Sequence, residues 1–229
     1  DRSKLSKRHG ATSVEELRNL GFVSKAVVNY IALLGWSPKD NVEIMPLEEI
    51  INKFDLSGIL DHPAVYDIEK MKYFNHYYIA NILDNKEILE SLNSIRNYDL
   101  EENLKLRVIE LEKNRVYLLT DFFELFDIIK NEVELNQDVI KELNEVERKV
   151  FDVIIKFFED LGDYSDIDGI RDSLKLLAKE NGLKVGQLYK PIRILLTGKL
   201  EGPELPKIIH LLGKDRVLKR INKIKDLVN

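Results

Sequence analysis

The chain has 229 residues, of which 44% are hydrophobic and 33% are charged, and its formal net charge is −5. This length supplies enough apolar material for one or two packed domains. No apolar run approaches the roughly 18 residues that a membrane-spanning helix needs, and the absence of cysteine excludes disulfides and thiolate metal sites. We therefore expect a soluble protein of the cytoplasm, and because residues 1–4 show neither Met nor a signal-peptide pattern, they are interpreted as the interior of a longer polypeptide.

The charges are unevenly distributed along the chain. Residues 84–166 carry 22 acidic against 11 basic side chains, whereas residues 184–225 carry 11 basic against 3 acidic ones. A basic segment of this kind can attract phosphate groups although the whole chain is acidic. Charge alone favours the alternative, in which these side chains form solvated helix faces.

Helical periodicity runs through nearly the whole sequence, and no segment alternates like a strand, so we predict an all-α fold. In the first third, a capping box at Ser13-Val14-Glu15-Glu16 opens a helix that stops near Gly21. Ser24 and Asp67 are expected to cap two later helices, and Pro46 suits the first position of a helix between them. The predicted ranges of these three are 26–34, 68–82 and 47–54.

The remaining helices are expected to be long and charged. Gly182 suits the left-handed position after a helix end, and residues 198–206, with two Gly and two Pro, are predicted to form a loop. Weak boundaries near 72–80 and 135–145 divide the chain into 1–75, 76–142 and 143–229. The helices are predicted at 85–95, 99–112, 119–130, 137–161, 167–181, 185–196, 206–212 and 214–227.

The segment Lys4-Leu5-Ser6-Lys7-Arg8 is the most distinctive motif. Two lysines that bracket a serine can bind a triphosphate through ammonium groups, a hydroxyl and loop amides. Alone, such a segment is more often a basic chain end. Its continuation, D-R-S-K-L-S-K-R-H-G-A-T-S-V-E-E-L and then A-V-V-N-Y-I-A-L-L-G-W-S-P, closely resembles bacterial-type glutamyl-tRNA synthetases where their K-M-S-K-S-type signature leads into the stem-contact region.

The resemblance continues to the end of the chain. V-Y-D-I-E-K-M-K-Y-F-N-H-Y-Y-I is similar to the family's stem-contact helix, and L-A-K-E-N-G-L-K-V-G-Q-L-Y-K-P-I-R resembles its terminal anticodon-binding domain, whereas residues 95–165 match only in outline. The family's Rossmann-type catalytic domain is missing, and His9-Gly10 does not supply its H-I-G-H signature. The resemblance implies an all-α arrangement, with a stem-contact domain (1–75) followed by two small helical anticodon-binding domains (76–142 and 143–229) that form an α-helix cage.

For the signature loop, the resemblance implies ATP binding. Lys7 corresponds to the residue that binds the ATP phosphates and steadies the adenylation transition state, with Lys4 and Ser6 supporting the loop. ATP and Mg²⁺ are therefore the expected cofactors of the full-length enzyme, while the fragment alone is expected to bind neither. The four histidines are scattered without metal spacing, so no metal site is predicted.

For the anticodon, the resemblance implies two reading arginines. Arg115 corresponds to the arginine that reads the third base, and Arg193 to one that contacts the first. Guanidinium groups can both stack on bases and hydrogen-bond to their edges. The alternative for Arg115 is a surface pair with Glu110 or Glu112. The loop expected around the splayed bases contains Gly202, Pro203 and Leu205, although Gly202 offers only backbone where relatives can carry a hydroxyl.

Other candidates are weaker. Lys219 and Lys223 in the basic segment are expected to contact phosphates without base preference. Trp36 is expected to fill the core between two helices. An aromatic group at helical spacing in and just before the 68–82 helix is also expected in the core rather than in stacking contact with RNA. Its members are Tyr66, Tyr73, Phe74, Tyr77 and Tyr78.

The function implied by the resemblance is tRNA binding and anticodon recognition within glutamate–tRNA ligase, which attaches glutamate to tRNA(Glu) using ATP. The implied partners are tRNA(Glu), glutamate and ATP, with tRNA(Gln) as a second candidate substrate that Arg115 disfavours, and a monomer is expected. The fragment alone is expected to be inactive. The alternative from another class is a stand-alone helical RNA-binding or protein-interaction module derived from a synthetase.

Overall fold

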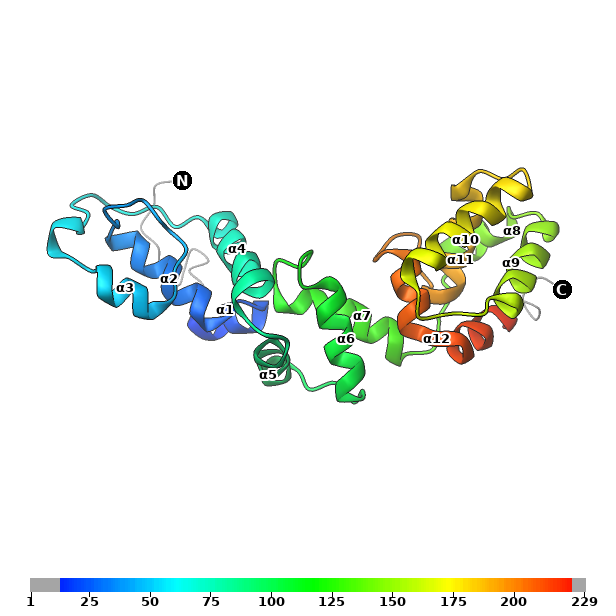
Figure 1. The fold of residues 1–229 in the computed structure, drawn as a ribbon, viewed down its shortest axis with the longest axis horizontal. Helices are drawn as coiled ribbons and strands as arrows, with labels where there is room; N and C mark the ends of the chain where they lie inside the picture. Colours follow the sequence, from blue (N-terminus) through cyan, green and yellow to red (C-terminus); the bar gives the residue numbers. More distant parts are fainter. Residues whose placement is uncertain (1–12, 224–229) are drawn as a thin grey trace. The chain divides into compact units, whose positions relative to one another are not determined.

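The computed structural model describes residues 13–223, and the elements in this part of the chain are helices joined by loops. Its only strand-like pairing in the described range is a single antiparallel bridge between Trp36 and Ile59. The predicted all-α fold is confirmed (Figure 1). The chain divides into two compact units, residues 1–126 and 127–229, which are described separately below. The expected division into three domains stays a prediction.

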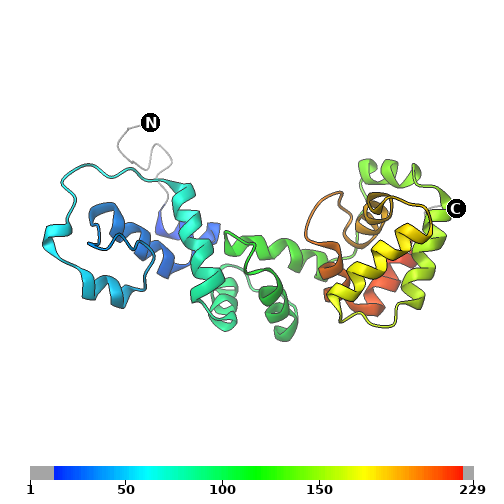
Figure 2. The ribbon, with the colours of Figure 1, turned by 45° about the horizontal axis from the view of Figure 1, so that its top comes forward.

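The first unit contains six complete helices among the described residues and the start of a seventh (Figures 1 and 2). The helices are α1 (Val14–Leu20), α2 (Ser24–Gly35), α3 (Leu47–Lys53), α4 (Ile68–Tyr77), α5 (Asn85–Ile95), α6 (Glu102–Glu112) and α7 (Phe122–Lys130), which continues into the second unit. Three short turns join them, η2 (Leu56–Gly58), the π-helical η3 (Tyr78–Ile82) and η4 (Leu119–Asp121).

Several predicted helix ends are confirmed in this unit. Ser13 and Glu16 form the capping box of α1, and Gly21 ends that helix with a φ of 100°. Asp67 caps α4 by accepting from two backbone N–H groups. Two other predictions were wrong. The cap of α2 is Val23 rather than Ser24, and Pro46 is the cap of α3 rather than its first residue.

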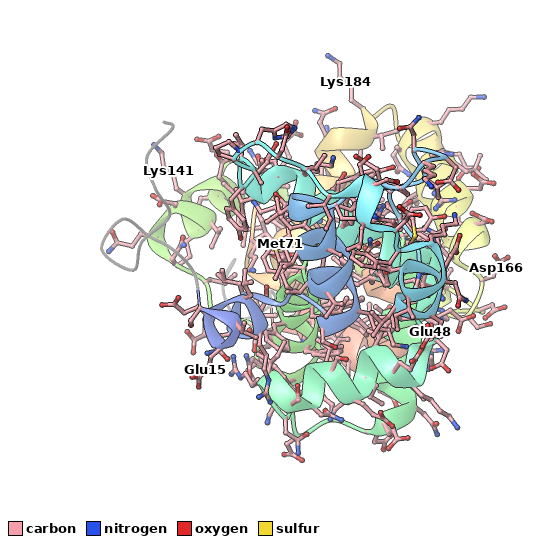
Figure 3. The ribbon with its side chains drawn as sticks, turned by 90° about the vertical axis from the view of Figure 1, so that its left-hand side faces the viewer. Glu15, Glu48, Met71, Lys141, Asp166 and Lys184 are labelled. Carbon is pink, nitrogen blue, oxygen red and sulfur yellow. The ribbon has the colours of Figure 1, made fainter. Side chains whose placement is uncertain are left out.

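One core cluster of the first unit lies among α1, α2 and α4. Tyr30 and Phe74 meet edge to face, with ring centroids 5.7 Å apart. Figure 3 labels Met71, which is fully buried in this cluster, and also Glu15 and Glu48, which are exposed. The buried members of the cluster are Leu17, Phe22, Val27, Tyr30, Met71 and Phe74.

A smaller core cluster lies beside the first. Trp36 packs against Met45 and Ile50, and its side chain is buried as predicted. The η2 turn packs so closely against the Trp36 indole that it requires glycine, since a Cβ at Gly58 would lie 2.6 Å from Trp36 Nε1.

The second unit is built around α11 (Val185–Thr197), which contacts all the other complete helices of the unit. These are α8 (Gln137–Asn144), α9 (Arg148–Asp160), α10 (Ile167–Glu180) and α12 (Leu205–Asn222). Four side chains of α11 are fully buried, namely Leu188, Ile192, Ile194 and Leu196.

The last two predicted helices exist as the halves of α12. Gly213 separates them with non-helical angles, φ 69° and ψ 173°. Elsewhere the predicted boundaries differ. The continuous helix expected over 137–161 is broken into α8 and α9, α6 begins at Glu102 rather than at residue 99, and η4 precedes α7 where one helix was expected over 119–130.

Candidate nucleic-acid interface

The predicted ATP-binding residues cannot be placed on this fold. Lys4, Ser6 and Lys7 lie outside the described residues. Their roles therefore stay predictions, and the candidate site is built from the predicted anticodon-reading residues, each in its own unit.

Arg115 lies in the turn that follows α6. Its backbone N–H donates to the carbonyl of Glu112 at 2.8 Å, which closes the helix end, and its side chain is exposed. The two preceding residues, Lys113 and Asn114, belong to the same turn. The chain therefore presents Arg115 at the surface, where a guanidinium can approach an unpaired base.

The segment after Arg115 is held by a hydrogen bond from a buried side chain, Asn75 of α4. Its Nδ2 donates to the carbonyl of Tyr117 at 2.7 Å and to that of Gly21 at 3.2 Å, while its Oδ1 accepts from Val23 N–H at 2.7 Å. One amide therefore joins three segments that are distant in the sequence. The backbone of Leu119 adds a hydrogen bond to the Gly21 carbonyl at 2.9 Å.

Gly21 is needed for this junction. Its φ of 100° disfavours other residues, and a Cβ there would lie 2.7 Å from the backbone nitrogens of Leu119 and Thr120. The loop that carries Arg115 is therefore held by close backbone packing as well as by Asn75.

The Tyr117 ring, two residues after Arg115, stacks on the His76 ring. His76 and Tyr117 lie with ring centroids 4.7 Å apart and planes 23° from parallel, and His76 Nδ1 lies 2.8 Å from the Val116 carbonyl. Tyr117 is half exposed. Phe74 and Tyr78 are in the core as predicted, whereas Tyr73 and Tyr77 are exposed, contrary to the expected core position of the whole group.

In the second unit, Arg193 contacts the predicted binding loop directly. It lies on α11, half-buried, and its NH1 donates to the Pro203 carbonyl at 2.6 Å. The carbonyl of Arg193 in turn accepts from the Thr197 hydroxyl at 2.8 Å, and that hydroxyl oxygen accepts from Lys199 N–H at 3.1 Å. Both ends of the loop are thus tied to the same turn of α11.

The 198–204 loop has two glycines with positive φ. Gly198 ends α11 at φ 71°, and a Cβ there would lie 2.5 Å from the Glu134 carbonyl oxygen. Gly202 has a φ of 144° and is exposed. Leu205, by contrast, is 1% exposed, so it anchors the start of α12 and is not available to bind RNA in this conformation.

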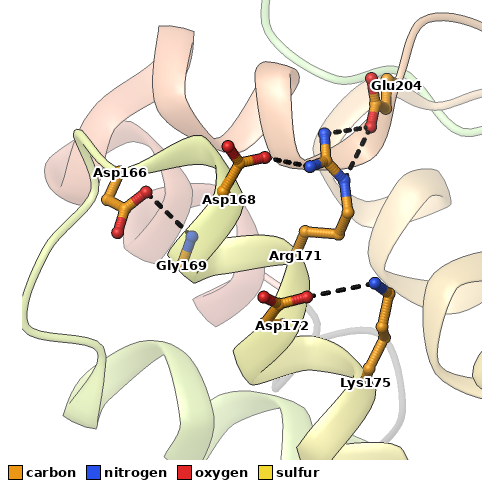
Figure 4. Close-up of polar contacts among 7 residues, drawn as sticks. All are labelled: Asp166, Asp168, Gly169, Arg171, Asp172, Lys175 and Glu204. Atoms are coloured by element: carbon orange, nitrogen blue, oxygen red, sulfur yellow. Dashed lines mark hydrogen bonds and ion pairs between the residues drawn. The ribbon is translucent and has the colours of Figure 1, made fainter.

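Arg171 of α10 holds the far end of this loop (Figure 4). Its Nε and NH2 both donate to Glu204 Oε1, at 3.1 and 2.6 Å, and its NH1 donates to Asp168. The interaction with these carboxylates raises the pKa of the Arg171 guanidinium. The sequence did not point to Arg171, because a basic residue three positions after an acidic one on a helix is typical of ordinary surface pairs.

Many charges of the basic segment are already used within the unit. Glu132 accepts from Lys219 at 2.6 Å and also from Lys223, and these hydrogen bonds lower the pKa of the Glu132 carboxyl to about 2. Lys190 pairs with Glu142. The ion pairs with Glu132 compete with the phosphate contacts predicted for Lys219 and Lys223.

Arg220 is buried rather than presented to a ligand. Its guanidinium donates to the carbonyls of Leu196, Ile128 at 2.7 Å and Asn131 at 2.9 Å, and its burial lowers its pKa. These carbonyls belong to the ends of α11 and α7, where helices leave carbonyls without intrahelical partners. Arg220 therefore has a structural role. The sequence did not indicate this role, because Arg220 lies among other basic residues.

The structure thus brings Arg193, Pro203 and Leu205 together in one unit, with Gly202 in the same loop. Arg115 belongs to the other unit, and the convergence of both arginines on one anticodon stays a prediction. Over residues 13–223, no group of three or more His, Cys, Asp or Glu side chains is placed to hold a metal ion, and none of the helices is long and apolar enough to cross a membrane.

Comparisons with known proteins agree with these features. Residues 69–225 match the family model described as the anticodon binding domain, and residues 1–73 match the catalytic domain of class I tRNA synthetases (E and Q). The chain is 36% identical to glutamate–tRNA ligase 2 of Caldanaerobacter subterraneus subsp. tengcongensis and 38% identical to glutamate–tRNA ligase 1 of Thermoanaerobacter sp. strain X514. Both matches cover 100% of this chain and 49% of the relative, so the chain spans about half the length of these relatives.

Solved structures give the same result. A glutamate tRNA ligase from Elizabethkingia meningosepticum superposes with a TM-score of 0.82 at 26% identity, covering 100% of this chain and 49% of that one. A glutamate-tRNA synthetase from Elizabethkingia anophelis superposes with a TM-score of 0.74 at 28% identity, covering 98% and 44%.

Proposed function

Because the chain belongs to the anticodon-binding domain family and corresponds to the C-terminal half of glutamate–tRNA ligases, we propose that it binds tRNA(Glu) and reads its anticodon. Recognition of this kind serves the ATP-dependent attachment of glutamate to tRNA. The chain contributes the stem-contact and anticodon-binding parts, and the remaining half of the relatives' length carries most of the catalytic domain.

The observation that carries this proposal is the loop at 198–204. A Gly/Pro loop lets backbone approach a base closely, and Arg193 lies directly against it through the Pro203 carbonyl. Single-stranded bases are recognised by hydrogen bonds to their exposed edges. In this proposal the first anticodon base contacts the exposed part of the loop and the Arg193 guanidinium, while Arg115 reads the third base.

ATP, Mg²⁺ and glutamate are proposed as ligands of the complete enzyme. The match of residues 1–73 to the class I catalytic domain supports the use of ATP, and Lys4, Ser6 and Lys7 are the proposed phosphate contacts. Bound ATP would supply the adenylyl group that activates the glutamate carboxylate, with pyrophosphate as the leaving group. Its Mg²⁺ would be held mainly by the phosphates themselves. A monomer and a cytoplasmic location are parts of the same proposal, and tRNA(Gln) is a second substrate in it only if Arg115 fails to discriminate.

The test is binding of the purified chain to transcripts of tRNA(Glu), tRNA(Gln) and tRNA(Glu) with single anticodon changes, at two salt concentrations. We expect preferential binding of tRNA(Glu), with a loss on the order of 1–3 kcal/mol for a wrong base at a directly read position. The chain alone should not catalyse ATP–pyrophosphate exchange. Equal affinity for all transcripts would contradict the proposal and favour the stand-alone RNA-binding module.

A further inference from the structure

The end of the 198–204 loop that enters α12 is held by arginines from two different helices. Arg193 of α11 donates to the Pro203 carbonyl at 2.6 Å, and Arg171 of α10 grips the carboxylate of the next residue, Glu204. Between these anchors and Gly198, residues 199–202 are exposed. The loop therefore has a solvent-facing tip on a fixed base.

The hydrogen bonds of Arg171 to Glu204 and Asp168 have a specific geometry. Two of its nitrogens share Glu204 Oε1, and the third is occupied by Asp168, which fixes the plane of the guanidinium (Figure 4). The side chains of Arg171 and Glu204 are 30% and 32% exposed, whereas that of Asp168 is 83% exposed. The contact with Glu204 is therefore the better shielded of the two from water and salt. A lysine could not reproduce this planar arrangement.

Glu204 is the residue that couples this contact to the loop. It is the N-cap of α12, with φ −60° and ψ 126°, yet its side chain does not cap the helix. Its carboxylate is instead directed to Arg171. The contact thus sets the direction in which the chain leaves Pro203 and enters α12, whose first residue, Leu205, is buried. Loss of it would leave this end of the loop held by the Arg193 hydrogen bond to Pro203.

We propose that Arg171 is a positioning residue for anticodon recognition, which holds Glu204 and thereby keeps Pro203 and the Arg193 guanidinium in register with the first anticodon base. This proposal rests on the proposed function. In it, Arg171 does not touch the RNA. Its effect reaches the base through the geometry of the loop, since fixed groups bind a ligand without first losing conformational freedom.

The test compares Arg171→Gln and Arg171→Lys with Lys179→Gln, which removes one positive charge from the exposed side of the same helix. Two quantities are measured on the whole chain: amide hydrogen exchange in residues 199–204, and affinity for tRNA(Glu) transcripts with the native or a changed first anticodon base. We expect Arg171→Gln to speed exchange in the loop and to reduce first-base discrimination by roughly 5-fold or more, with third-base discrimination unchanged. Arg171→Lys should be intermediate, and Lys179→Gln should match the unaltered chain.

Unchanged loop exchange in Arg171→Gln would overturn the proposal, as would faster exchange with full first-base discrimination. Equal losses at the first and third bases would also overturn it, because they would indicate a general loss of folding or of charge. If the unaltered chain does not distinguish the transcripts, the proposed function fails, and with it the role of Arg171 in recognition. The exchange data would then still decide whether Arg171 restrains the loop.

Discussion

Arg115 and Arg193 use their side chains differently, although the family resemblance gives both the same kind of role. Arg193 is half-buried and donates to the loop that it is proposed to share with a base. Arg115 is exposed in a turn, and the rigidity there comes from the neighbouring residues through Asn75. A guanidinium has five donors, and Arg193 uses NH1 to fix its loop.

Arg115→Gln should relax the choice of the third anticodon base. Glutamine removes the charge and the planar fork but keeps a polar side chain, so base discrimination should fall by about 1–3 kcal/mol at that position only. The measurement is the affinity for transcripts that differ at the third base. An equal loss for every transcript would instead assign Arg115 to a phosphate contact.

Asn75→Ala should destabilise the first unit strongly. The change removes three hydrogen bonds and leaves the Val23 N–H and the Tyr117 carbonyl without this partner, while the Gly21 carbonyl keeps Leu119 N–H. The loss costs roughly 2–4 kcal/mol. Trp36 is the only tryptophan and lies in the core of this unit, so its fluorescence during urea unfolding reports the loss. Asn81→Ala is the control, since this exposed amide bonds only within its own helical segment. If Asn75→Ala loses no more stability than Asn81→Ala, the Asn75 hydrogen bonds do not hold the three segments together.

At the scale of elements, the sequence predicts helices well and their interruptions poorly. The break between α8 and α9 contains neither Gly nor Pro, and the buried residues Val139, Leu143, Val150 and Ile154 keep the spacing of one continuous helix. The two helices are separate because each packs on α11, a tertiary contact that local periodicity does not reveal. The break at Gly213 was predictable because a glycine there permits a positive φ.

Arg220→Met should destabilise the second unit alone. Methionine keeps part of the buried volume but leaves the carbonyls at the ends of α7 and α11 without their donor, for a loss on the order of 3 kcal/mol. Circular dichroism should show earlier melting, while the Trp36 fluorescence transition of the first unit stays in place. Arg216→Met, an exposed change on the same helix, is the control. Parallel shifts in both variants would contradict the structural role of Arg220.

The pairs of Glu132 with Lys219 and Lys223 should make the second unit sensitive to acid. The folded-state pKa of Glu132 is lowered from 4.5 to about 2. Its contribution to stability is therefore present above the unfolded value and is lost as the pH falls through the folded value. Thermal melts of the unaltered chain and of Glu132→Gln should differ at pH 7 and converge toward pH 2. Because these groups are exposed, a small difference is expected. A difference between the two melts that persists at pH 2 would show that the Glu132 ion pairs are not its cause.

At the scale of the whole molecule, the resemblance located the candidate loop, but sequence alone could not separate binding charges from structural ones. The fold class and the position of the 198–204 loop were predictable from periodicity and from its Gly and Pro content. The uses of Arg171, Arg220 and Glu132 were not, because each depends on partners that lie 24 to 92 residues away along the chain. Net charge by segment therefore overstates how much positive charge the second unit offers to RNA.

Glu132→Gln tests this last point, because the change frees two ammonium groups without altering the anticodon loop. Each additional phosphate that a freed lysine neutralises should steepen the dependence of log affinity on log salt by roughly 0.7–0.9. We therefore expect tighter tRNA binding at low salt, a slope steeper by about 0.7–1.8, and unchanged discrimination among anticodon variants. Glu145→Gln is the matched control, since it removes the same negative charge from an exposed residue of the same unit that forms no ion pair with a described lysine. If both variants bind alike at every salt concentration, only net charge matters, and Lys219 and Lys223 do not contact the RNA backbone.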